Sequence, residues 1–227
     1  METGTYRNNL SIGVSVPAFL NSGMKKILVG LLLGLSMASL AQDKNALNEK
    51  VEKFLREHRE EWHDLNVPYV DGQTLYDLIV KNGYKSALEI GTSTGHSTIW
   101  LAWAMSKTGG KVITVELNER RHKQAIKNLT EAGLIDYVDA RLGNAHELAK
   151  QLPGPFDFVF SDADKDWYKQ YFIDVTPKLV KGGCFTAHNV TDGNVPQEYV
   201  EFVNSQKQFE TAIDRKSRSG IQISFKK

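Results

Sequence analysis

The first candidate ligand-binding segment is a short apolar stretch followed by small residues. The segment from Ala87 to Ser97 reads ALEIGTSTGHS. Gly91 and Gly95 can adopt backbone angles that other residues avoid, and they let a ligand approach the main chain. The start of a following helix would offer free N–H groups to an anionic ligand. The pattern is typical of a cofactor pocket, although many strand-to-helix turns carry glycine for packing alone.

An acidic residue ends the next apolar stretch. Glu116 closes the sequence VITVE, 25 positions after Gly91. A carboxylate at this position can accept hydrogen bonds from both hydroxyls of a ribose. Alternatively, Glu116 is a favourable charge ahead of the helix that begins after Asn118. The third glycine of a dinucleotide fingerprint is missing, which favours S-adenosylmethionine (SAM) over a pyrophosphate cofactor.

Polar residues also follow the third and fourth apolar stretches. Asn144 comes after Leu142 and Gly143, where it can meet the edge of an adenine or simply cap a helix. The fourth stretch, FDFVFS, is followed by Asp162, Ala163, Asp164 and Lys165. Charged residues at such a place either form a reactive cluster or a solvated turn.

The Asp-Ala-Asp-Lys string, with Tyr168 and Tyr171 after it, resembles the catechol and caffeoyl-CoA O-methyltransferases, a class I family. The EIGT turn at 89–92 shares this resemblance, which covers about residues 70–227. The resemblance implies SAM as cofactor, Asp162 as a ligand of a divalent metal, and Lys165 as the group that takes the proton of the acceptor hydroxyl. The candidate SAM-binding residues are Glu89, Gly91, Thr92, Gly95, Ser97, Glu116, Asn144, Ala145 and Asp162.

Such a site must activate a hydroxyl toward the methyl group of a sulfonium cation. A metal or a base promotes this reaction, because the deprotonated oxygen is the better nucleophile. A hard cation held by carboxylate and amide oxygens would bind both oxygens of a catechol and orient one of them toward the methyl group. Lys165 is the candidate base.

One position departs from the family pattern. Where the family has Asp-Asn after the fifth strand, this chain has His188 and Asn189. Imidazole binds Mn, Fe, Co or Zn and is a poor ligand for Mg or Ca. His188 is therefore a ligand of a softer metal together with Asp162 and Asn189, a metal-free catalytic base beside Lys165 and Asp162, or a structural residue. Asp192 lies near enough in sequence to supply the missing charge.

The elements that must position these residues alternate between strands and helices, which predicts an α/β fold with a parallel sheet. The expected strands are 86–90, 111–116, 137–142, 156–161 and 183–188, and the helices between and before them are 46–62, 73–81, 97–105, 119–132, 145–151 and 167–179. A helix at 197–205 and a hairpin of 209–213 with 220–225 follow. Five parallel strands and such an antiparallel hairpin predict a Rossmann-like, seven-stranded methyltransferase sheet with helices on both faces.

Composition limits the function classes. The chain has 227 residues, 41% hydrophobic and 24% charged, which suits one domain. A formal net charge of +1 does not favour nucleic acid as a partner. The partner is expected to be a small-molecule acceptor, and the resemblance suggests a homodimer.

The N-terminal region has the pattern of a secretory signal. Lys25 and Lys26 precede the apolar run from Ile27 to Leu40, whose 14 residues are too few to span a bilayer. Residues 24–41 are thus expected to be a signal peptide or short anchor, 1–23 a non-native or mis-assigned extension, and 42–227 the methyltransferase domain. A signal would direct the protein to a bacterial periplasm, and an unused signal would leave it in the cytoplasm.

Three functions remain open from the sequence. The first is a SAM-dependent O-methyltransferase acting on a small catechol-like acceptor with the help of a metal. The second is an exported binding protein that keeps the fold without turnover. The third is a metal-independent methyltransferase acting on another nucleophile.

Overall fold

The computed structural model describes residues 42–227. The chain divides into two units, Met1–Asn45 and Ala46–Lys227. Every element discussed below belongs to the second unit, apart from residues 42–45 at the start of the first described helix. The expected extension at 1–23 and signal segment at 24–41 lie outside the described residues. Within the described part, no helix is both long and apolar enough to cross a membrane.

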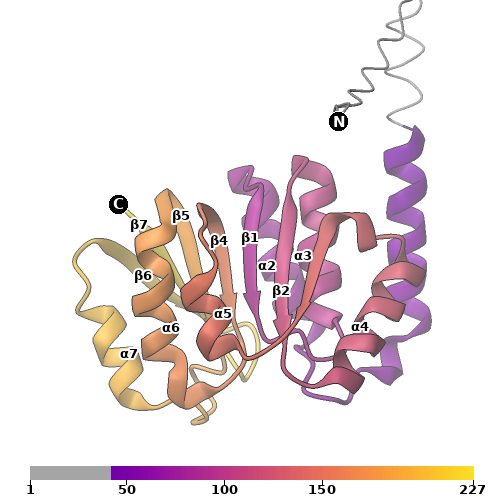
Figure 1. Ribbon diagram of the computed structural model, residues 1–227. Coiled ribbons are helices and arrows are strands. Elements are labelled where there is room, and N and C mark those ends of the chain that lie inside the picture. The colour runs from indigo at the N-terminus through magenta and orange to yellow at the C-terminus, as the bar shows by residue number, and fades with distance from the viewer. Residues whose placement is uncertain (1–41) are drawn as a thin grey trace, which may run out of the picture. The chain divides into compact units, whose positions relative to one another are not determined.

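A seven-stranded sheet forms the centre of the second unit (Figure 1). Its strands are β1 (Ser86–Ile90), β2 (Lys111–Glu116), β3 (Val138–Leu142), β4 (Phe156–Ser161), β5 (Leu179–His188), β6 (Phe209–Asp214) and β7 (Ile221–Lys226). The spatial order is β3-β2-β1-β4-β5-β7-β6. The first five strands are parallel, and β7 runs antiparallel to both β5 and β6. The predicted fold class is therefore confirmed, with the second strand of the hairpin placed next to β5.

Helices cover both faces of the sheet (Figure 1). They are a first helix over 42–57, α2 (Tyr69–Asn82), α3 (His96–Thr108), α4 (Glu119–Ala132), α5 (Ala145–Gln151), α6 (Tyr168–Val175) and α7 (Gln197–Asn204). The first helix, α2, α3 and α4 pack into one hydrophobic cluster, and α5, α6 and α7 pack into another. Along β4, Phe158 and Phe160 join the first cluster, while Phe156 and Val159 join the second. Burial on both faces explains why the sequences of the central strands β1 and β4 are mostly apolar.

Several helix bounds differ from the predicted ones by a few residues, and two of these differences have an identifiable cause. Helix α2 begins at Tyr69 rather than at residue 73, because Gly72 lies inside the helix instead of before it. A Cβ atom at Gly72 would lie 2.2 Å from the Trp100 ring, so glycine is what lets α3 pack against α2. Helix α6 ends at Val175 because Pro177 follows, and a 3-10 turn over Thr176–Lys178 leads directly into β5.

Candidate active site

A pocket of about 800 Å³ opens at the carboxyl ends of the parallel strands. Loops that follow β1 to β5 line it, and the strand arrows in Figure 1 point to this edge. This is the edge where open α/β sheets bind ligands. Most of the predicted site residues line the pocket, namely Gly91, Thr92, Ser97, Glu116, Asn144, Ala145, Asp162, Lys165, His188 and Asn189.

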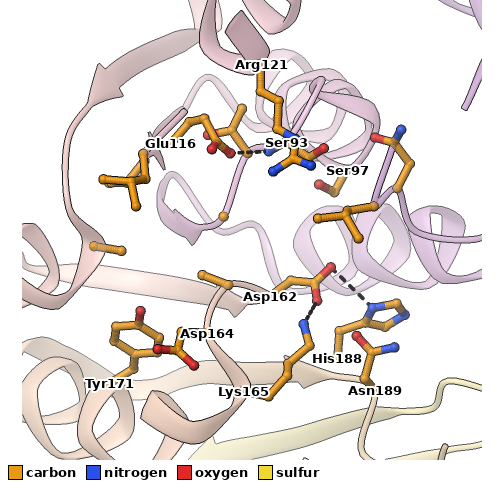
Figure 2. A pocket seen from close by; sticks show the side chains of 18 of the residues that line it. Ser93, Ser97, Glu116, Arg121, Asp162, Asp164, Lys165, Tyr171, His188 and Asn189 are labelled. Atoms are coloured by element: carbon orange, nitrogen blue, oxygen red, sulfur yellow. Dashed lines mark hydrogen bonds and ion pairs between the residues drawn. The ribbon is translucent and has the colours of Figure 1, made fainter. Parts of the chain in front are cut away.

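Glu116 is held rigidly at one end of the pocket. Its Oε2 atom accepts a hydrogen bond from the backbone N–H of Ser93 at 2.7 Å, and Oε1 accepts one from Asn118 at 2.8 Å. The first bond ties the end of β2 to the turn after β1, as Figure 2 shows. Because the backbone fixes the carboxylate against the pocket, its remaining lone pairs are oriented for a ligand.

Two residues near Glu116 were not foreseen from the sequence. Arg121 lines the pocket and forms an ion pair with Asp64, with Nη2 2.6 Å from Oδ1. The guanidinium group holds the pKa of Asp64 below its ordinary value. The backbone carbonyl of Asp64 also accepts a hydrogen bond from the Ser93 hydroxyl. These contacts fix the segment before α2 over the turn after β1. They join distant parts of the chain, so no local sequence motif predicts them.

Asn144 caps a helix and also lines the pocket. Its side chain caps α5 by accepting a hydrogen bond from the backbone N–H of His146 at 3.0 Å. Together with Ala145 and His146 it also lines the pocket. The His146 ring stacks on Trp167 with centroids 4.2 Å apart, so this wall of the pocket carries a flat aromatic surface.

Two candidate SAM contacts, Glu89 and Gly95, are not among the residues that line the pocket. Glu89 is fully buried in β1, where the hydroxyls of Thr98 and Thr114 donate to its Oε2 at 2.5 Å each. Gly95 begins α3 with φ +95°, and a Cβ atom there would lie 3.2 Å from the Cβ of Ala125. Glu89 and Gly95 therefore stabilise the turn after β1 from the side away from the pocket.

Gly91 lines the pocket and has a backbone angle that other residues avoid, as expected, and it also lets two loops pack closely. Its φ is +104°, and a Cβ atom would lie 2.8 Å from the backbone oxygen of Asp162. Glycine at this position lets the loop after β4 close against the turn after β1. That closure brings Asp162 into the middle of the pocket, between Glu116 and Lys165 (Figure 2).

Three groups lie close to the Asp162 carboxylate. The Lys165 ammonium group contacts Oδ1, and the Tyr168 hydroxyl lies 3.5 Å from the same oxygen. Nδ1 of His188 lies 3.3 Å from Oδ2, an ion-pair distance without the alignment of a hydrogen bond. Burial raises the pKa of Asp162, but His188 and Lys165 outweigh it and hold the pKa below its ordinary value.

His188 lies between two carboxylates. Besides facing Asp162, it donates from Nε2 to Oδ2 of Asp71 at 2.8 Å. Burial lowers the pKa of His188, but the hydrogen bonds and charges of Asp162 and Asp71 dominate and raise it to about 9. An imidazole with this pKa is protonated at neutral pH and does not act as a base there. The sequence analysis did not identify Asp71, which lies in α2 far from the motif strands.

The donor set does not fit a divalent cation. Both oxygens of Asp162 already face cations, and both nitrogens of His188 face carboxylates. Asn189 donates its amide to Oδ2 of Asp192 at 2.7 Å, and Asp192 also interacts electrostatically with His188. A metal would have to displace the Lys165 ammonium group and a proton of His188. Across residues 42–227, no group of three or more His, Cys, Asp or Glu side chains is arranged to hold a metal ion.

Curated proteins are similar in sequence to about half of the chain. The chain is 41% identical over 119 residues to a catechol O-methyltransferase of Niastella koreensis, covering 50% of this chain and 53% of that protein. It is 33% identical over 133 residues to caffeoyl-CoA O-methyltransferase 1 of Eucalyptus globulus, covering 56% and 54%. The chain thus spans about half the length of the curated relatives it matches.

Solved structures and a family model agree with these relatives. An O-methyltransferase from Bacillus cereus in complex with SAH superposes with a TM-score of 0.66 at 28% identity, covering 79% of this chain and 91% of that one. A structure titled a caffeoyl-CoA O-methyltransferase from Staphylococcus aureus gives 0.69 at 27% identity, covering 85% and 100%. The O-methyltransferase family model matches residues 37–223. The chain therefore belongs to the O-methyltransferase family.

Proposed function

We propose that this protein transfers a methyl group from SAM to a hydroxyl of a small aromatic, catechol-like acceptor. The observation that carries the proposal is a single pocket with two different ends. Glu116 lies at one end and the Asp162–Lys165 pair at the other (Figure 2). A methyl donor and an acceptor need such neighbouring subsites, because the reaction requires the two substrates in line and close together.

The cofactor is assigned to the Glu116 end. Glu116 would accept hydrogen bonds from the ribose hydroxyls, and the stretch from Asn144 to His146 would contact the adenine. The turn from Gly91 to Ser97 would face the amino acid part of SAM. Relatives support SAM as the cofactor, since the Bacillus cereus O-methyltransferase was solved with SAH and an O-methyltransferase from Streptomyces achromogenes with SAM.

The acceptor is assigned to the Lys165 end. In this proposal the Lys165 ammonium group beside Asp162 first releases a proton to water, and the neutral amine then takes the proton of the acceptor hydroxyl. The resulting oxyanion attacks the methyl carbon of the sulfonium. The carbon–sulfur bond breaks as the oxygen–carbon bond forms, which leaves neutral S-adenosylhomocysteine. Asp162 orients Lys165 and stays paired with the ammonium group. No step is assigned to a divalent cation, because the donor set does not fit one.

The experiment measures methyl transfer from radiolabelled SAM to a dihydroxybenzoate and to a caffeoyl thioester, with SAM binding followed by calorimetry. We expect turnover with at least one acceptor. Glu116→Gln should raise the Kd for SAM roughly 10- to 100-fold, because hydrogen bonds to a charged group are lost. Glu119→Gln removes an exposed carboxylate at the start of α4, three positions after Glu116, and should leave the Kd unchanged.

The two measurements separate the competing functions. SAM binding without transfer to any acceptor would favour a binding protein that keeps the fold but has no turnover. A chain that does not bind SAM at all would overturn the proposal.

A further inference from the structure

A buried bridge connects α2 to the pocket. His188, at the end of β5, is only 3% exposed and contacts Asp71 on one side and Asp162 on the other. Asp71 is 2% exposed and belongs to α2, which precedes the whole sheet in sequence. The three side chains therefore link α2, the loop after β4 and the end of β5 at one point.

In this bridge the side chains of His188 and Lys165 occupy the places beside carboxylates where a metal site would hold a cation. Two carboxylates, Asp71 and Asp162, face each other across His188, and the Lys165 ammonium group contacts the free oxygen of Asp162. Two buried carboxylates on either side of one imidazole ring are stabilised by positive charge on that ring. The imidazolium of His188 and the ammonium of Lys165 balance them one for one.

Asp71 is itself held in place. The Ser217 hydroxyl donates to Oδ2 of Asp71 at 2.7 Å, the same oxygen that accepts from His188. Ser217 in turn accepts from the backbone N–H of Gly220 at 3.2 Å, which fixes it in the loop between β6 and β7. A carboxylate held from both sides fixes the orientation of the imidazole ring, as second carboxylates do for histidines in metal sites.

We propose that His188 takes the place of a divalent cation at this site and that Asp71 is the positioning residue that holds it there. The inference rests on the proposed methyl transfer and adds that this transfer needs no divalent metal. Lys165 then contacts a single acceptor oxygen, and chelation of two vicinal oxygens is not part of recognition. Asp162 is kept in position by protein cations alone.

The experiment uses the full chain and two independent readouts, Mn²⁺ binding by electron paramagnetic resonance and methyl transfer in EDTA. We expect no stoichiometric Mn²⁺ binding and turnover in EDTA equal to that in Mn²⁺ or Mg²⁺. In His188→Asp three carboxylates would converge without the imidazolium, and they would need a hard cation. That variant should bind Mn²⁺, and its turnover should fall about tenfold in EDTA and recover with metal, as expected when an orienting ligand is lost.

Asp71 is tested by a matched pair of variants in one helix. Asp71→Asn should lower kcat about tenfold or more with the KM for SAM unchanged, because a displaced His188 misplaces Asp162 and Lys165. Asp71→Glu should restore part of kcat. Asp77→Asn alters an exposed aspartate of the same helix and should change neither constant.

The outcomes separate this inference from the proposed function. Stoichiometric Mn²⁺ binding by the unaltered chain, or turnover abolished by EDTA and restored by metal, would overturn the inference while leaving methyl transfer intact. A chain that binds SAM but transfers no methyl group would overturn the proposed function, and the Mn²⁺ measurement would still decide the inference. If His188→Asp fails to fold, the unaltered chain and the Asp71 pair give the decision.

Discussion

Buried carboxylates in this chain have different partners, and the partners decide their charge. Asp162 faces His188 and Lys165, which hold its pKa below the ordinary value despite burial. Glu89 lies in the neighbouring strand and has only hydroxyl donors. Burial raises the pKa of Glu89 to about 7, and the hydrogen bonds from Thr114 and Thr98 only reduce this increase. Glu89 should therefore make the stability of the protein depend on pH.

Glu89→Gln tests this dependence. The folded-state pKa is raised from 4.5 to about 7, so between these values the folded protein binds more protons than the unfolded chain. Stability therefore falls as pH rises through this window, by about 3 kcal/mol for this residue. Because glutamine carries no charge, the variant should gain about that much free energy of unfolding relative to the unaltered protein between pH 4.5 and pH 8. Urea unfolding of both proteins at the two pH values measures it.

Glu147→Gln provides the control for this change. It removes the same charge from an exposed position in α5. Its difference from the unaltered protein should stay nearly constant over the same pH range, since exposed charges interact weakly. A Glu89→Gln difference that is equally constant would show that burial does not control the protonation of Glu89.

Sequence reasoning identified the residues whose role depends on a strand end, and it missed those whose role depends on distant contacts. Glu116, Asp162 and Lys165 were found because they follow apolar strands whose ends must meet in a parallel sheet. Asp71 was missed because it lies before the helix predicted at 73–81, and nothing in the local sequence places it beside His188. Only the packing of α2 against the sheet, 117 positions from His188 in sequence, brings the two together.

At the scale of elements, the approach of the β4 loop to the β1 turn decides the shape of the pocket. Gly91 permits that approach, since its missing side chain leaves room for the backbone of Asp162. Gly109 also has a positive φ, +75°, but a Cβ atom there would have nothing within 4 Å. The two glycines therefore share a backbone requirement and differ only in crowding.

Alanine substitutions at these two glycines separate the two effects. Gly109→Ala should cost about 1 kcal/mol of stability, the cost of a left-handed conformation with a side chain. Gly91→Ala should cost roughly 3 kcal/mol, because the added methyl group also displaces the backbone at Asp162. It should weaken SAH binding as well, while Gly109→Ala should not. Urea unfolding and calorimetry measure the two quantities, and equal effects would refute the role of Gly91 in closing the pocket.

Strand bounds were easier to predict than helix bounds for a physical reason. Strands β1, β2 and β4 begin and end at the expected residues because both of their faces are buried, which makes their apolar runs continuous. Helix α2 was started too late because Gly72 was not expected inside a helix. Its place there depends on Trp100 of α3, a tertiary contact that outweighs helix propensity.

For the molecule as a whole, the described core predicts that residues 42–227 fold and bind SAM without the preceding segment. Both hydrophobic clusters consist of residues after position 45, and every residue that lines the pocket does too. A protein that begins at Gln42 should bind SAH as tightly as the full chain. At 100 times the Kd, SAH should add about 2.7 kcal/mol to the stability of either protein.

Thermal unfolding of both proteins, with and without SAH, measures this prediction. For a domain of this size, that gain should raise Tm by roughly 5 to 10 °C. A shorter chain that unfolds at the same temperature as the full chain and gains the same increase places all of the binding energy in residues 42–227. If the increase is present only in the full chain, the preceding residues complete the pocket, and the site built from the strand ends is insufficient by itself.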